Sequence, residues 1–315
     1  MIKKDEWVED RITDLLPCPY YHVVFTVPHE WNKIMLQNPR ELYKILFDAA
    51  SETLLTLGNN DKYLGATPGV TNVLHTWGQT LDYHVHLHCI VSGGGIKKGK
   101  WIEPKRINGK FLFPITVLKK VYKGIFLKLV RERKDQIAVE ETQIDQAIEV
   151  SGKKKWKVYA KQPFGGPEQV VRYLGRYTHK TAISHYRVKS VDKNNIYFNY
   201  KDYRDGKIKE MTLTHREFMS RFERHILPYR FVRIRHYGLL KNQGKVERLK
   251  KLREEMDWGA SPPKVVVSTT IRMLEKYGVN VGKCTKCNKG YYELVLTKRF
   301  GEITYYKPRD VPLEA

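Results

Sequence analysis

Three histidines alternate along one short stretch of the chain. His84, His86 and His88 lie in residues 83–91, whose apolar and aromatic residues predict a β-strand. Alternate residues of a strand share a face, so the three imidazoles should point the same way. Same-face neighbours lie about 6.6 Å apart, which two imidazoles can close over one metal ion, whereas the outer pair lies about 13 Å apart. The stretch therefore predicts a metal site built on two adjacent histidines.

A third ligand is expected from the preceding strand. Residues 70–77 also read as a strand, and the short polar link 78–82 predicts an antiparallel hairpin. A turn about residues 80–81 places residue 75 opposite residue 86, about 5 Å away at Cβ, and residue 75 is a histidine.

His75, His86 and His88 would then form a three-imidazole site with open coordination positions, as catalysis requires. His84 is the alternative ligand if the register differs. A structural zinc site and a solvated histidine-rich strand are the competing interpretations.

Two tyrosines lie four residues apart further along the chain. On a helix, Tyr173 and Tyr177 share one face, and Arg172 and Arg176 form a parallel pair beside them that could hold a phosphate. A phenol becomes a nucleophile when it is deprotonated or held near cationic charge. In a chain with 20 tyrosines, such a pair taken alone is more often core packing.

Patterning of apolar residues predicts the elements that position these groups. Strands are expected at 20–27, 70–77, 83–91, 156–160, 183–188, 196–200, 207–213 and 231–237, and helices at 39–57, 117–133, 136–150, 216–226 and 269–277. A further helix should carry Tyr173 and Tyr177, and residues 241–253 form a basic helix. The run Gly93, Gly94 and Gly95 should end the strand that carries the histidines, and without side chains it would let a DNA backbone pass close to the metal.

The charge of the chain points to a polyanionic partner. Its 57 Lys and Arg residues exceed its 34 Asp and Glu residues by 23. Such a surplus favours nucleic acid as the partner. In residues 229–237, Arg230, Arg233 and Arg235 are interleaved with apolar and aromatic residues, a combination that suits single-stranded nucleic acid. A sheet-edge strand with charged residues that prevent aggregation is the alternative.

Cysteine usage and hydropathy bear on the compartment. Residues 1–16 are charged and contain no signal-peptide core, and no uncharged run approaches the roughly 18 residues of a membrane span. The isolated Cys18 and Cys89 do not make a disulfide framework, so a reducing cytoplasm is expected. Cys284 and Cys287 supply half of a tetrahedral zinc site, which another subunit or a histidine would have to complete.

The order and spacing of these motifs resemble a known family. Residues 5–245 resemble the rolling-circle insertion-sequence transposases with two tyrosines (the IS-ninety-one type) of the HUH endonuclease superfamily. The matching blocks are Phe25-Thr26-Val27-Pro28, Leu74-His75-Thr76-Trp77-Gly78, His84-Val85-His86-Leu87-His88, Ser92-Gly93-Gly94-Gly95, Tyr173-Leu174-Gly175-Arg176-Tyr177-Thr178, Ala182-Ile183-Ser184, Arg221-Phe222, His225-Ile226-Leu227-Pro228 and Arg233-Ile234-Arg235 with Tyr237-Gly238.

The resemblance implies an α+β fold with a central antiparallel sheet of ferredoxin-like type and flanking helices. His86 and His88 would be the two-histidine motif, holding magnesium or manganese, and Tyr173 and Tyr177 the nucleophiles that form a 5′-phosphotyrosine on single-stranded DNA at the element ends. A related relaxase or replication-initiator nickase, or a catalytically silent nucleic-acid-binding protein, is the alternative.

The same reasoning predicts the domain organisation and the location of the protein. Residues 1–190 should form the catalytic domain, with a basic insertion at about 97–115. Residues 191–260 should form a strand-rich basic DNA-binding extension, and residues 261–315 a smaller α/β appendage that carries the cysteine pair. A bacterial cytoplasmic protein associated with the nucleoid is expected, with DNA and no membrane as its partner.

Overall fold

The computed structural model describes two compact units, Lys3–Pro263 and Lys264–Ala315. The residues that the structure describes are 2–104, 112–161, 168–169, 171–172, 175, 182–263, 269–284, 286–287, 289–292, 296–299 and 302–305.

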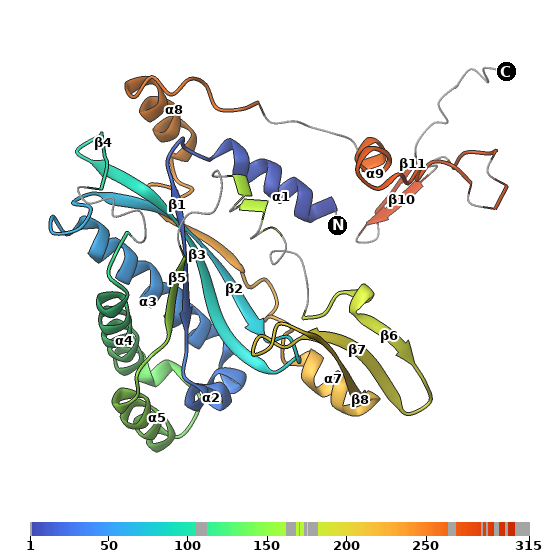
Figure 1. The fold of residues 1–315 in the computed structure, drawn as a ribbon, viewed down its shortest axis with the longest axis horizontal. Helices are drawn as coiled ribbons and strands as arrows, with labels where there is room; N and C mark the ends of the chain where they lie inside the picture. Colours follow the sequence, from blue (N-terminus) through green and yellow to red (C-terminus); the bar gives the residue numbers. More distant parts are fainter. Residues whose placement is uncertain are drawn as a thin grey trace. The chain divides into compact units, whose positions relative to one another are not determined.

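A central antiparallel sheet organises the first unit (Figure 1). Its strands, in spatial order, are β5 (Val158–Lys161), β1 (Tyr20–Thr26), β3 (Tyr83–Lys97), β2 (Thr67–Trp77) and β9 (Ile234–Gly238), and β4 (Lys100–Ile102) pairs with the far end of β3. Each neighbouring pair is antiparallel. The expected α+β class with an antiparallel sheet and flanking helices is therefore confirmed.

The main hydrophobic core lies between one face of this sheet and three helices, α3 (Pro39–Asn59), α4 (Ile115–Glu132) and α5 (Glu141–Lys153). Pro39 starts α3, where its fixed φ suits a helix and its missing N–H is not needed. Val85, Leu87, Cys89 and Val91 alternate along β3 and enter this core. The intervening residues of β3, among them the histidines, therefore face the other side of the sheet.

That other face is covered over only part of its length. Helices α1 (Ile2–Thr13) and α8 (Lys245–Glu255) pack with Ile90 and Trp101 in a second, smaller core. Ile90 comes directly after the histidine segment, so this cover begins where the histidines end. The half of β3 nearer to its start lies beside a cleft.

A small three-stranded sheet packs against the tip of the β2–β3 hairpin. It consists of β6 (Val188–Val191), β7 (Asn195–Lys201) and β8 (Ile208–Thr214), followed by α7 (His215–Glu223). Trp77 and Leu81 from the hairpin share a buried cluster with Phe198 and Leu213 from the small sheet. Leu81 is fully buried and has a positive φ of 62°, which shows how tightly this turn is held.

Further short elements complete the two units. The first also contains α2 (Asn32–Gln37), and the second contains α9 (Thr269–Tyr277) and a hairpin of β10 (Leu296–Arg299) and β11 (Glu302–Tyr305). No helix among the described residues is long and apolar enough to cross a membrane.

Several predicted boundaries differ from the structure. The strand expected at 183–188 is a 3-10 turn, His185–Arg187, followed by β6, and the helix expected at 136–150 begins only at Glu141. The strand expected at 231–237 begins at Ile234 and joins the central sheet, although it lies within residues 191–260 that were expected to form an extension. The pairing of β9 with β2 joins segments far apart in the chain, which local patterning does not reveal.

Candidate functional site

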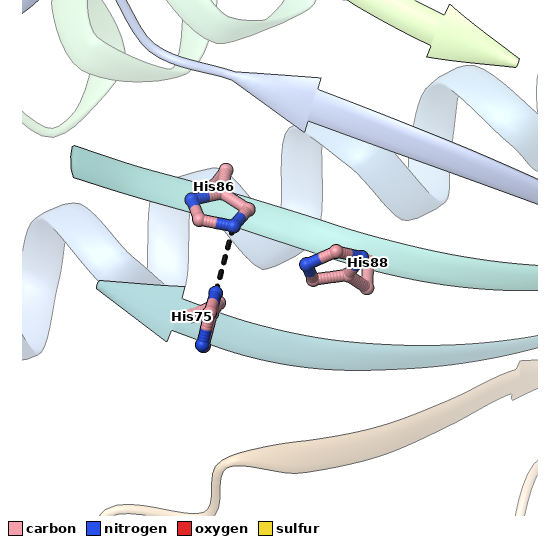
Figure 2. A group of neighbouring side chains, drawn as sticks. All are labelled: His75, His86 and His88. Carbon is pink, nitrogen blue, oxygen red and sulfur yellow. Dashed lines mark hydrogen bonds between the residues drawn. The ribbon is translucent and has the colours of Figure 1, made fainter. Parts of the chain in front are cut away.

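Three histidines converge on the face of the β2–β3 hairpin that borders the cleft (Figure 2). His75 of β2 is the direct antiparallel partner of His86 of β3, so the predicted register is confirmed. Nδ1 of His75 lies 2.8 Å from Nε2 of His86. One ring nitrogen of His88 faces the other two residues in Figure 2, and a nitrogen from each of the three lies within 4.8 Å of the others.

The protonation state of these imidazoles follows from their burial. His75, His86 and His88 are all less than 10% exposed. Burial disfavours the charged form, which lowers the pKa of His86 to about 4 and the pKa values of His75 and His88 well below the ordinary value. The charges of the neighbouring histidines act in the same direction. All three are therefore neutral at neutral pH, the form in which histidine binds a metal.

A backbone hydrogen bond sets the tautomer of His86. Its Nδ1 lies 2.7 Å from the carbonyl oxygen of His84. A carbonyl can only accept, so Nδ1 carries the proton and Nε2 carries the lone pair that faces the cluster. The side chain of His84 is exposed and does not belong to the group of three. The carbonyl of His84 orients His86, and the ring of His84 lies beside that of His86, with centroids 5.0 Å apart, and lines the same cleft.

His22 is a neighbour of the site that the sequence motifs did not indicate. It lies on β1, and its Nε2 is 2.8 Å from Nδ1 of His88. The two rings are stacked, with centroids 5.1 Å apart and planes 10° from parallel. Burial lowers the pKa of His22 to about 4, so it too is neutral. His22 and His88 are 66 residues apart in the sequence, and only the pairing of β1 with β3 brings them together. The segment that carries His22 was predicted as a strand, but nothing in the sequence linked it to the site.

A cleft of about 640 Å³ opens in front of the histidines. Further lining comes from β5, on the same face of the sheet as the histidines, and from the small sheet and the segment before it, including the turn between β7 and β8. These lining residues are Tyr159, Arg187, Tyr200, Lys201, Asp202, Tyr203 and Arg204. The cleft thus combines neutral imidazoles with exposed phenol rings and cationic side chains.

The predicted nucleophiles Tyr173 and Tyr177, and Arg176, lie outside the described residues. Arg172 is described, and its exposed guanidinium forms an ion pair of 3.3 Å with Glu168 one helical turn earlier. Its role in holding a phosphate stays a prediction.

The three arginines of residues 229–237 do not form one row. Arg233 lies 5.0 Å above the ring of Trp77, and its Nε donates to the carbonyl of Leu74 at 3.3 Å. Burial lowers its pKa to about 10. Arg235 instead stacks on Phe47 of α3, on the opposite face of the sheet, and Arg230 is exposed with a positive φ of 59°. Their separation corrects the expectation of a single half-exposed strand.

The glycine run has a packing role. Strand β3 continues through Gly93, Gly94 and Gly95 to Lys97, so the predicted strand end was wrong. All three are buried, and a Cβ on Gly94 would lie 2.1 Å from the ring of Trp101. Close packing against neighbouring protein atoms explains why these positions are glycines, and access for a DNA backbone stays a prediction.

Cys284 and Cys287 lie in the second unit with free thiols. Backbone N–H groups near Cys287 hold the pKa of Cys284 at about 7, below its ordinary value. In the part of the chain that the structure describes, no histidine, further cysteine or carboxylate lies close enough to these two cysteines to complete a metal-binding group.

Comparison with known proteins places the chain in a family. The family described as "Putative transposase" matches residues 69–247. "Putative transposase y4qJ" of Sinorhizobium fredii (strain NBRC 101917 / NGR234) is 35% identical over 96% of this chain and 79% of that protein. "Transposase for insertion sequence element IS801" of Pseudomonas savastanoi pv. phaseolicola is 26% identical over 82% of this chain and 63% of that protein.

Among solved structures, the "Conjugative Relaxase Trwc In Complex With Orit DNA. Metal-Bound Structure" is similar over 50% of this chain and 69% of that chain, with 14% identity and a TM-score of 0.28. The family match covers more than half of the chain and includes β2 from residue 69 onward and all of β3, with the three histidines. This chain therefore belongs to the family of insertion-sequence transposases of the rolling-circle type that its motifs predicted.

Proposed function

We propose that this transposase cuts and rejoins single-stranded DNA at the ends of its element, with a divalent ion on His75, His86 and His88 and with Tyr173 and Tyr177 as nucleophiles. The observation that carries the proposal is the convergence of three neutral imidazoles beside an open cleft in a chain of transposase ancestry. Three protein ligands with space in front of them are typical of catalytic rather than structural metal sites.

The donor set fits a divalent ion. The ligand atoms lie close enough to share one ion, and burial keeps them free of competing protons. Bound there, magnesium or manganese would polarise the scissile phosphate and offset its negative charge. Imidazole nitrogens are poor ligands for magnesium, which demands oxygen, whereas divalent transition-metal ions, of which manganese is the weakest binder, accept nitrogen. Manganese is therefore the ion of choice for binding measurements.

The phenol oxygen of one tyrosine would attack phosphorus, and the P–O bond to the 3′ oxygen would break. The products are a 5′-phosphotyrosine and a DNA 3′-hydroxyl, which takes up the proton that the phenol loses. A 3′-hydroxyl can later attack the phosphotyrosine and regenerate the phenol, so the strand is rejoined without ATP. Two nucleophiles allow one 5′ end to be held while a second phosphate is attacked.

Covalent adduct formation tests the nucleophiles. Single-stranded oligonucleotides labelled on the 3′ side of the cut should give a slower protein band on a denaturing gel, and mass mapping should place the DNA on Tyr173 or Tyr177. The double variant Tyr173→Phe with Tyr177→Phe should form no adduct, because only the two hydroxyls are lost. Tyr186→Phe, which removes the hydroxyl of an exposed tyrosine, is the matched control. An adduct in the double variant, or one mapped to Tyr203, would overturn the assignment.

Histidine variants test the metal ligands. His86→Ala or His88→Ala should abolish cleavage, chelator should do the same to the wild type, and His75→Ala should be nearly as severe. His29→Ala is the control, because that side chain is 79% exposed and does not line the cleft, and His84→Ala, at the rim of the cleft, should cost less than His75→Ala. Cleavage by the double alanine variant of His86 and His88 in excess chelator would refute the metal proposal. A greater loss in His84→Ala than in His75→Ala would show that another set of ligands is used.

DNA binding by the rest of the first unit is a part of the same proposal. The surplus of 23 positive charges favours a polyanion, and Arg172, Arg176 and the exposed Arg230 are candidates for phosphate contacts. Residues 191–260 would act as the DNA-binding extension. A zinc ion on Cys284 and Cys287 stays a prediction from their spacing.

A further inference from the structure

The turn between β7 and β8 forms one side of the histidine cleft, and its position there calls for an explanation. We propose that this turn, residues 202–206, together with Tyr159 of β5, is a platform on which unpaired bases stack next to the scissile phosphate. The inference rests on the proposed function, because it supplies the single-stranded substrate with a binding surface beside the metal ligands. It assigns Tyr203 as the principal stacking residue.

An internal network holds the turn in one shape. The carboxylate of Asp202 accepts from the backbone N of Arg204 at 3.0 Å, from its Nε at 3.1 Å and from its Nη2 at 2.9 Å, and from Nζ of Lys209 at 2.8 Å. These donors hold the pKa of Asp202 well below its usual range. Gly206 has a φ of 72°, which favours glycine and closes the turn. Tyr203 is thus presented by a preformed scaffold.

A second set of contacts fixes the turn against the histidine hairpin. Nε2 of Gln79 donates to Oη of Tyr203 at 3.1 Å, and Oε1 of Gln79 accepts from the backbone N of Lys201 at 3.5 Å. Arg187 donates to the carbonyl of Gln79. Gln79 follows His75 by only four residues, so these bonds set the distance between the turn and the metal ligands.

The rings presented in this way are exposed. Tyr203 is 75% exposed and Tyr159 is 53% exposed, yet both line the cleft. Tyr159 pairs with Val24 of β1, which in turn pairs with His88, so Tyr159 shares the histidine face of the sheet. Two rings held at the mouth of a cleft contribute little to the core. Their placement favours a partner with flat, apolar faces of its own.

Charge identifies that partner as nucleic acid. Lys201, Arg187 and Arg204 line the same side of the cleft, and Asp202 offsets part of their charge. The side chain of Arg204 remains 88% exposed even while it pairs with Asp202. Aromatic rings for bases combined with cations for phosphates are the surface that single strands require, whereas bases in a duplex are not open to stacking. The platform would tolerate any sequence, because every base has a π-face.

The test measures equilibrium binding with chelator present, so cleavage and metal are not involved. The two ligands are a fluorescent oligothymidylate and an abasic oligonucleotide of the same length, which keeps the phosphates and lacks the bases. Tyr203→Ala should weaken oligothymidylate binding by about fivefold or more and leave abasic binding unchanged. Tyr203→Phe should keep most of the oligothymidylate affinity and all of the abasic affinity, because the ring remains and Gln79 still accepts from the backbone N of Lys201. Tyr291→Ala, which removes a tyrosine of 72% exposure in the second unit, is the control.

Three results would overturn the platform. They are unchanged oligothymidylate binding in Tyr203→Ala, an equal loss on the abasic ligand, and a loss in Tyr203→Phe as large as in Tyr203→Ala. Gln79→Ala is an independent variant that keeps the Tyr203 ring but removes both hydrogen bonds from Gln79 to the turn. It should weaken oligothymidylate binding and leave abasic binding unchanged. If the wild type binds as expected but forms no phosphotyrosine, the proposed function fails while the platform stands.

Discussion

Replacement of His22 by phenylalanine should weaken metal binding even though His22 is not a proposed ligand, because His22 acts through His88. If His88 ligates through Nε2, its Nδ1 carries the proton and donates to Nε2 of His22, which is 2.8 Å away. That bond orients the imidazole of His88 and increases the basicity of its ligating nitrogen. His22→Phe removes the acceptor and keeps a planar ring where the two rings now stack.

The size of the effect follows from burial. His22 is 3% exposed and His88 is 7% exposed, so water cannot readily replace the lost acceptor. A buried donor that loses its acceptor costs about 1–3 kcal/mol, and loss of an outer-shell partner typically lowers metal affinity about 10- to 100-fold. We expect the dissociation constant for Mn²⁺ to rise by about tenfold, which corresponds to about 1.4 kcal/mol.

Isothermal titration calorimetry with Mn²⁺ measures this directly. His29→Ala is the control, because it also removes an imidazole, but one whose side chain is 79% exposed. A thermal melt of each protein without metal checks that the fold is retained. A dissociation constant for His22→Phe within about twofold of the wild-type value, in a protein with an unchanged melting temperature, would refute the positioning role of His22.

Two further predictions concern packing and charge. Gly94→Ala should lower the free energy of unfolding by about 1–3 kcal/mol in urea titrations, because the new Cβ would overlap Trp101. It should leave Mn²⁺ affinity unchanged. A stable variant that loses DNA affinity would instead support a role for the glycines in DNA approach. Affinity for single-stranded DNA should fall with salt, and Lys201→Ala should make the log–log slope shallower by about 0.7, the contribution of one phosphate. Equal affinity for single and double strands, with little salt dependence, would contradict the single-strand interpretation.

The histidine hairpin could be predicted from the sequence because its determinants are local. Alternation fixes which side chains of residues 83–91 share a face, and a short link leaves few registers, so the pairing of His75 with His86 followed from counting. The α+β class and most helices were accessible for the same reason. Local pattern suffices where the partner is close in the chain.

The surroundings of the site could not be predicted in this way. His22 reaches His88 only through the pairing of β1 with β3, and Tyr203 reaches the cleft only because the small sheet packs on Leu81. Neither position carries a local signal that distinguishes it from other histidines or tyrosines. The strand was predicted to end too early because glycine often marks loops. In the structure Gly94 makes room for Trp101, while Gly93 and Gly95 lie close to the backbone of Pro19 and Thr67.

The burial of Leu81 has a consequence for the order of assembly during synthesis. All three histidines have been made once the ribosome reaches residue 88, but the apolar partners of the hairpin tip, Phe198 and Leu213, come more than 100 residues later. Strand β9, which closes the other side of β2, ends at Gly238. Contacts of such long sequence separation form late. A partial translation product therefore contains the three histidines of the site but lacks the segments that fix their geometry, so assembly of the histidine site depends on completion of the first unit.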